Sequence, residues 1–185
     1  MRISNNPSSI RSKKEITNAL LKLMETIPYN EITVKQIVLE TNLVRKTFYR
    51  NFKSKDDVLN NYIKTAIKEY TDALTSGNDA PLSVIFDFCE RNKKMLTLLD
   101  KNNMLHLLLL QLNENIPIIS SQTNPKNNPF AKSFKGLDSD YLIAFNIGAI
   151  WNVLFTWVRK GMNEPIDNVQ KNIEEYLVRM STSIK

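Results

Sequence analysis

Apolar residues recur at helical spacing along most of this chain, and that periodicity restricts its fold more than any other feature. Ile16, Leu20 and Leu23 lie three or four residues apart, and a longer apolar stripe runs from Val58 to Leu74. This spacing places the apolar side chains on one face of an α-helix. Runs that alternate like a β-strand are few, and only 4 of the 185 residues are glycine. The sequence therefore predicts an all-α protein.

The same pattern, together with capping and breaking residues, gives the expected order of the helices. We expect helices over residues 12–26, 33–40, 44–51, 55–75, 81–91, 93–100, 102–115, 139–160 and 165–181. Residues 116–138 contain three prolines among many Asn, Lys and Ser residues, which predicts a long loop.

These helices group into four parts. Residues 1–10 are rich in Ser and Asn and are expected to form a flexible arm. Residues 11–57 form a predicted DNA-binding domain, and residues 58–75 a connecting helix. Residues 76–185 are expected to form a regulatory and dimerisation domain.

The residue types that usually build catalytic or metal sites are scarce. The chain has one cysteine, Cys89, and one histidine, His106, so neither a disulfide nor a cluster of such ligands can form within it. We expect no metal, no cofactor and no enzymatic activity. The N-terminus has no signal-peptide pattern, and no apolar run approaches the roughly 18 residues of a membrane span. The sequence therefore predicts a cytoplasmic protein that does not bind membranes.

Positive charge is concentrated in the first third of the chain. Residues 1–64 hold twelve Lys or Arg and six Asp or Glu, whereas residues 65–185 hold thirteen of each. The whole net charge of +6 therefore belongs to the N-terminal part. Such segregation indicates a polyanion-binding domain attached to a neutral body.

Residues 33–55 have the pattern of a helix-turn-helix. Thr33 with Gln36 forms a capping-box pattern before a short helix, and residues 41–43 form a tight turn. A second short helix follows, and its first turn holds Arg45 and Lys46, whose donors can reach guanine in the major groove. The partner that this pattern predicts is a double-stranded DNA operator.

The other polar residues of this region are expected to contact the DNA backbone, while two rings anchor the helix. Phe48 and Phe52 are four residues apart and share a face, which predicts that they pack against the preceding helices. The predicted DNA-contacting residues are Thr33, Arg45, Lys46, Thr47, Tyr49, Arg50, Asn51 and Lys55.

The segments 33–37, 41–43, 45–52 and 54–59 closely resemble the DNA-binding domain of the TetR family of bacterial regulators. The resemblance covers residues 12–62 and is strongest in the Thr-Phe-Tyr-x-x-Phe pattern followed by Lys. It implies base contacts for Arg45 and Lys46, and phosphate contacts for Thr33, Thr47, Tyr49 and Lys55. It also implies an all-helical ligand-binding domain beyond residue 76, with a homodimer formed by the last two helices.

Two positions depart from the family pattern. The family usually has Gly at position 42 and Ser at position 44, where this chain has Asn and Val. Asn42 is expected to tolerate a left-handed turn. Val44 has no polar atom on its side chain, so it can neither cap the following helix nor bind a phosphate, and Thr41 or Asn42 would have to compensate.

The C-terminal helices supply candidate residues for a dimer interface and for a ligand pocket. The helix over 139–160 is apolar around most of its circumference, which predicts contacts on several sides, and Gly148 would allow another helix to approach closely. Predicted dimer contacts are Trp151, Phe155, Val169, Ile173 and Tyr176. Predicted pocket residues are Phe88, Met95, Met104, His106, Tyr141, Phe145 and Trp151.

Two hypotheses about function remain open at this point. In the first, a dimeric regulator binds a palindromic operator and is released by a small-molecule effector. In the second, a regulator of the same fold is controlled by a partner protein, and activation of transcription is a possible outcome. A closed apolar cavity in the C-terminal domain would favour the first hypothesis, and a filled core would favour the second.

Overall fold

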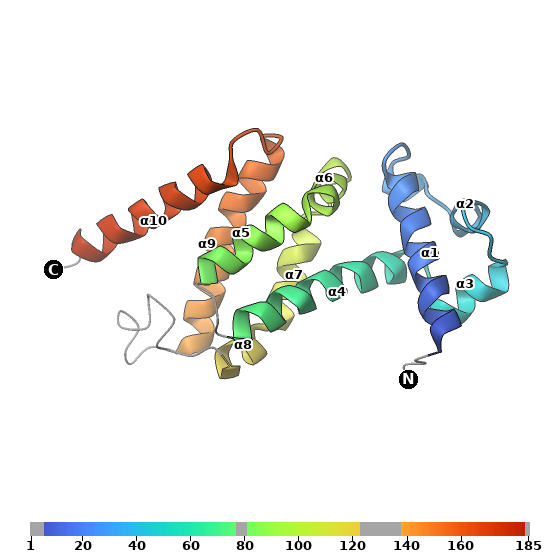
Figure 1. The fold of residues 1–185 in the computed structure, drawn as a ribbon, viewed down its shortest axis with the longest axis horizontal. Coiled ribbons are helices and arrows are strands. Elements are labelled where there is room, and N and C mark those ends of the chain that lie inside the picture. Colours follow the sequence, from blue (N-terminus) through green and yellow to red (C-terminus); the bar gives the residue numbers. More distant parts are fainter. Residues whose placement is uncertain (1–5, 77–80, 123–137, 184–185) are drawn as a thin grey trace. The chain divides into compact units, whose positions relative to one another are not determined.

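The computed structural model describes residues 6–76, 81–122 and 138–183, and every regular element in these ranges is a helix (Figure 1). The prediction of an all-α protein is confirmed. The chain divides into two compact units, residues 1–66 and residues 67–185.

The N-terminal unit is a small helical domain in which three helices pack on one another. Helix α1 contacts both α2 and α3, and α2 contacts α3. Buried side chains from all three helices, such as Leu20, Ile37 and Phe48, form its core. Its elements are α1 (Pro7–Met24), the 3-10 helix η1 (Tyr29–Glu31), α2 (Val34–Leu39), α3 (Arg45–Asn51) and the first part of α4 (Lys55–Ser76).

Helix α1 begins five residues earlier than its apolar periodicity indicated. The side chain of Asn6 accepts a hydrogen bond from the Ser8 backbone N–H, and Pro7 occupies the first helical position. Asn and Pro are favoured at these two positions. Residues 7–10, which we expected in a flexible arm, are therefore the first turn of α1, and residues 1–5 lie outside the described ranges.

Helix α4 contributes residues to both units, and its start is fixed by two side chains. The Asp57 backbone N–H donates to Ser54 Oγ at 3.2 Å, and Asp57 Oδ2 accepts from the Lys53 backbone N–H at 2.8 Å. These bonds satisfy N–H groups that have no partner within a helix. From Val58 to Tyr70 the helix buries the apolar stripe that the sequence predicted.

The C-terminal unit is built around α9. Helix α9 contacts α6, α7 and α8, while α10 contacts α5. Residues 116–122, which we expected in a loop, form helix α8, and residues 123–137 lie outside the described ranges. The helices after α4 are α5 (Pro81–Arg91), α6 (Lys93–Lys101), α7 (His106–Glu114), α8 (Ile116–Gln122), α9 (Ser139–Arg159) and α10 (Ile166–Ser183).

Four aromatic rings meet edge to face in the core of this unit. Tyr70 lies 5.6 Å from Phe88, Phe88 lies 5.8 Å from Trp151, and Trp151 lies 5.6 Å from Phe155, all between ring centroids. Such pairs add to the stabilisation from burial alone. Cys89 is buried beside Phe88, and burial raises the pKa of its thiol to about 12.

Helices α6 and α9 end in the same type of turn. At α9, Met162 N–H donates to the Trp157 carbonyl and Gly161 N–H to that of Val158, and Gly161 has a φ of 78°. This is a Schellman motif, in which a left-handed residue closes the helix. At α6 the left-handed residue is Asn103, with a φ of 57°.

Helix α9 corrects one expectation about membranes. The sequence has no uninterrupted apolar run of sufficient length, yet residues Asp140–Arg159 are long and apolar enough to cross a bilayer by length and composition. An uninterrupted apolar run is too strict a test for a membrane-spanning helix, because Asn146 and Asn152 break the run while the helix as a whole stays apolar. The core helix of a soluble protein meets the same criterion, and α9 contacts three other helices of its unit.

Candidate nucleic-acid interface

Helices α2 and α3 and the turn between them form the predicted helix-turn-helix. Thr33 Oγ1 accepts from the Gln36 backbone N–H at 3.3 Å, and Gln36 Oε1 accepts from the Thr33 N–H at 2.8 Å. The capping box is therefore complete at the start of α2. Phe48 and Phe52 are both buried, with ring centroids 6.3 Å apart. The prediction that these two rings anchor α3 is confirmed.

The turn is closed by a threonine side chain and not by a left-handed asparagine. Thr41 Oγ1 donates to the Val38 carbonyl at 2.9 Å and accepts from the Leu43 N–H at 3.2 Å. Among the described residues, a positive φ occurs only at Asn103, Gly161 and Met162. The expectation that Asn42 is left-handed is therefore wrong, because the Thr41 hydroxyl stabilises the turn in its place.

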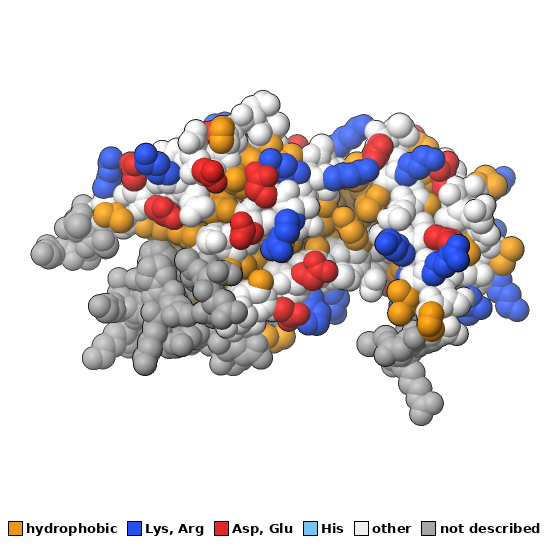
Figure 2. All heavy atoms as spheres, viewed as in Figure 1, with side chains coloured by type: hydrophobic (Ala, Val, Ile, Leu, Met, Phe, Trp, Pro, Cys, Tyr) orange, Lys and Arg blue, Asp and Glu red, His pale blue; other side chains and the backbone are white. Residues whose placement is uncertain are grey.

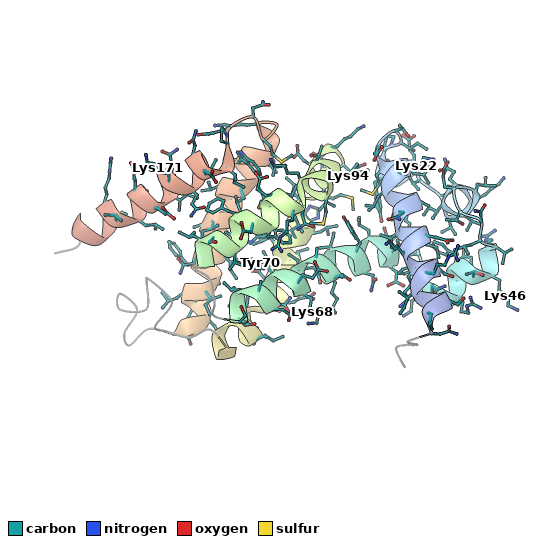
Figure 3. The ribbon with its side chains drawn as sticks, in the orientation of Figure 1. Lys22, Lys46, Lys68, Tyr70, Lys94 and Lys171 are labelled. Carbon is teal, nitrogen blue, oxygen red and sulfur yellow. The ribbon has the colours of Figure 1, made fainter. Side chains whose placement is uncertain are left out.

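Opposite the buried rings, α3 presents an exposed cationic face. Arg45, Lys46, Tyr49 and Arg50 are all exposed. Arg45 Nη2 donates to the Tyr49 hydroxyl at 3.3 Å, and its guanidinium carbon lies 5.5 Å from the centre of the Tyr49 ring. Figure 2 shows Lys and Arg side chains on the surface of this unit, and Figure 3 shows Lys46 projecting from α3. Three cations and one phenol thus share one helix face.

Asn51 instead makes contacts within the domain. Its Nδ2 donates to the Thr47 carbonyl at 2.8 Å, and its Oδ1 accepts from Ser9 Oγ at 2.8 Å. These bonds connect the end of α3 to the first turn of α1, which lie side by side in Figure 1. Thr47 is half-buried next to Phe48. In this structure, therefore, both ends of the Asn51 amide are used within the domain.

Lys55 is also held within the domain. Its ammonium donates to the backbone carbonyls of Tyr29 at 2.6 Å, Asn30 at 3.1 Å and Ile32 at 2.8 Å. An ammonium has only three donors, so all of them are used. The same Nζ lies 4.7 Å from the centre of the Tyr29 ring. The phosphate contact expected of Lys55 stays a prediction, and within the chain its ammonium joins the start of α4 to η1.

The neighbouring residue strengthens this connection. The Tyr29 hydroxyl donates to Asp56 Oδ1 at 2.6 Å. Burial, and then this hydrogen bond, raise the pKa of Tyr29 far above its usual value. The phenol therefore keeps its proton at neutral pH. Two consecutive residues of α4 thus bind two different groups of Tyr29.

Two further exposed lysines of this unit have no role in the sequence-based prediction. Lys35 lies in the first turn of α2, and Lys53 lies between α3 and α4. Both are exposed. Lys53 lies within residues 33–55, so its charge was visible in the sequence, but its exposure was not.

The predicted pocket residues do not surround one site. Phe88, Met95 and Trp151 are buried, Met104 is half-buried, and His106 is exposed. Tyr141 and Phe145 are 78% and 72% exposed on the outer face of α9. The predicted pocket therefore separates into core residues and surface residues. Among the described residues, no group of three or more His, Cys, Asp or Glu is placed to hold a metal ion.

Three of the predicted dimer contacts are covered by their own chain. Trp151, Phe155 and Val169 are buried, so their side chains cannot form an outer surface. Ile173 is half-buried and Tyr176 is 60% exposed. Both line an open groove of α9 and α10, together with Val153, Thr156, Trp157, Lys160, Asn163, Glu164, Val169 and Asn172.

The contacts of Lys55 lead to a prediction about stability. Lys55→Met should lower the free energy of unfolding by about 1–3 kcal/mol, because three carbonyls lose a charged donor. The measurement is urea denaturation followed by circular dichroism. Lys53→Met is the matched control, since an exposed lysine should change stability by no more than about 0.5 kcal/mol. Equal stability of the two variants would contradict the structural role of Lys55.

Comparisons with known proteins agree with this geometry. The family model described as "Bacterial regulatory proteins, tetR family" matches residues 16–62. Among solved structures, the "Dihydroxyacetone kinase operon activator DhaS" is similar, with a TM-score of 0.58 and 18% sequence identity. The alignment covers 92% of this chain and 96% of that one, and at this identity it shows a shared fold. No curated protein matches the sequence significantly.

The residues that match the family model, the helix-turn-helix and the exposed cationic face all lie in the N-terminal unit. The family consists of DNA-binding transcription factors without enzymatic activity. The N-terminal unit is a DNA-binding domain of the TetR family, and the chain is a TetR-type transcriptional regulator.

Proposed function

We propose that the chain binds a palindromic operator as a homodimer and that its C-terminal unit receives the regulatory signal. The observation that carries the DNA-binding part is the division of α3 into two faces. Phe48 is buried on one side, and Arg45, Lys46 and Arg50 are exposed on the other. A cationic helix face of this kind fits the major groove. As a bacterial DNA-binding regulator, the protein would act in the cytoplasm, where the DNA is.

Arg45 and Lys46 are the proposed base-contacting residues. Both lie in the first turn of α3, the part of a recognition helix that meets base edges. The hydrogen bond from Arg45 to the Tyr49 hydroxyl limits the orientations of the guanidinium before DNA binds. A side chain that is already ordered loses less entropy on binding.

Phosphate contacts are proposed for the remaining polar residues. Tyr49 and Arg50 are exposed on the same helix, and Thr33 is exposed at the start of α2. Thr47, Asn51 and Lys55 stay in this group, although the Asn51 amide and the Lys55 ammonium must exchange their bonds within the domain to reach DNA. Such contacts set the position of the protein on the duplex and do not depend on base sequence.

The proposed dimer surface is the outer face of α9 and α10. On α9, Tyr141 and Phe145 are exposed, and Gly148 has no atom within 4 Å of an added Cβ. On α10, Tyr176 is 60% exposed. Large apolar side chains around a small residue allow two helices to pack closely. This face replaces the buried contacts Trp151, Phe155 and Val169.

Two kinds of regulatory signal have support. A small-molecule effector is supported by the Trp151 indole N–H and Gln111 Oε1, which are buried without a hydrogen-bond partner among the described residues. A ligand with polar groups could satisfy such atoms. A partner protein is supported by the ring cluster of Tyr70, Phe88, Trp151 and Phe155, which fills the core.

The similar structure is that of an operon activator by its name. Activation is therefore a proposed outcome for this chain as well, beside repression. A thermal-shift screen of metabolites separates the two signals, because a small-molecule effector raises the melting temperature by binding the folded state.

The division between base and phosphate contacts gives a binding prediction. Arg45→Ala should cost about 1–3 kcal/mol on the operator and much less on random DNA, because it removes a base contact. Arg50→Ala should weaken binding to both DNAs similarly and reduce the salt dependence by about one unit. The measurement is titration of both DNAs at several salt concentrations. Equal losses for Arg45→Ala on both DNAs would make Arg45 a backbone contact.

The dimer surface gives a second prediction. Phe145→Glu should convert the dimer to a monomer, because it places a carboxylate in the apolar interface while the side chain is 72% exposed in the single chain. Leu110→Glu is the matched control, since Leu110 is 54% exposed on α7, a helix that is not part of the proposed surface. Sedimentation velocity measures the assembly. If both variants sediment like the unmodified chain, the dimer forms elsewhere.

A further inference from the structure

Val44 occupies a position that its chemistry does not suit. It is the N-cap residue of α3, with an extended backbone (φ −90°, ψ 153°) and no side-chain hydrogen bond to the helix. N-cap positions favour Ser, Thr, Asp and Asn, and valine is among the poorest residues there. The side chain of Val44 therefore gives α3 no cap.

Packing within the chain does not explain the valine either. Its side chain is 66% exposed, whereas Phe48, one turn further along α3, is completely buried. A β-branched apolar residue that neither caps nor packs contributes little to the folded state. Residues that break a local rule in this way are expected at functional sites.

The surroundings of Val44 indicate what it contacts. Arg45 and Lys46 follow directly and are exposed, so the valine belongs to the cationic end of α3. Such a surface favours DNA over an apolar protein partner. The apolar group that DNA presents in its major groove is the C5-methyl of thymine. A branched aliphatic side chain beside two groove-facing cations is well suited to contact it.

We propose that Val44 is a specificity-determining residue that recognises a thymine in each operator half-site through its C5-methyl group. This inference rests on the proposed function, in which the first turn of α3 enters the major groove. It extends that function, because it assigns a base preference to an uncharged residue. Arg45 and Lys46 recognise hydrogen-bonding groups on the bases, and Val44 adds a contact that depends on a methyl group alone.

The test begins with an operator selected from random duplexes by the full-length protein. Each thymine of the selected half-site is then replaced by uracil, in both half-sites together, which removes only the methyl group. At one position the unmodified protein should lose about fourfold in affinity per half-site, the effect of removing one methyl from an apolar contact. Val44→Ala should bind the thymine duplex more weakly and should not distinguish thymine from uracil there.

Two further variants separate this contact from general effects. Leu39→Ala removes another exposed apolar side chain of the same domain, 74% exposed at the end of α2, and should keep the full response to uracil. Val44→Ser supplies a cap, so it should raise the melting temperature while it abolishes the discrimination against uracil. A variant that is more stable but less selective cannot owe its loss to misfolding.

Several results would overturn the proposal. One is an operator at which no uracil replacement weakens binding. Another is a Val44→Ala protein that responds to uracil as the unmodified protein does. In both cases the protein still binds its operator, so the proposed function stands. If no duplex is selected and all DNAs bind equally, the proposed operator recognition fails as well, and the role of Val44 fails with it.

Discussion

Burial of one aromatic face of α3 is the constraint on which the DNA-binding unit depends. This helix has 7 residues, too few to be stable alone in water. It is held by Phe48 and by Phe52 just beyond its end, whose rings enter the core against α1 and α2. Because this face is fixed inward, the opposite face with Lys46 and Arg50 must point outward, and Arg45 beside it is exposed as well. The same packing therefore stabilises the helix and orients the residues that meet DNA.

Much of this unit could be predicted from sequence because its signals are local. The capping box at Thr33 and Gln36 and the spacing of Phe48 and Phe52 involve residues three or four positions apart. Lys55 shows where such reasoning ends. Its ammonium binds carbonyls 23 to 26 residues earlier in the chain, and no short-range pattern reports that contact. The sequence predicts a phosphate contact for Lys55 and gives no sign of these partners within the domain.

The C-terminal unit was predicted less well for a different reason. Periodicity shows that α9 is apolar nearly all round, but not which side meets its own chain. Trp151 and Phe155 face inward, and Tyr141 and Phe145 face outward, although all are aromatic residues of one helix. Burial within the chain and burial in a dimer require the same residue types, so only the packing of α9 on α6, α7 and α8 separates them.

The lone cysteine has a practical consequence for following this protein in action. Cys89 is fully buried, and with a pKa of about 12 its thiol rarely forms the reactive thiolate at neutral pH. A cysteine introduced on an exposed surface would therefore react with a spin label or fluorophore long before the native one. A variant with one added cysteine in its DNA-binding unit can thus be labelled there while Cys89 stays in place. In an assembly of two such chains, the distance between the two probes would report how the DNA-binding units move.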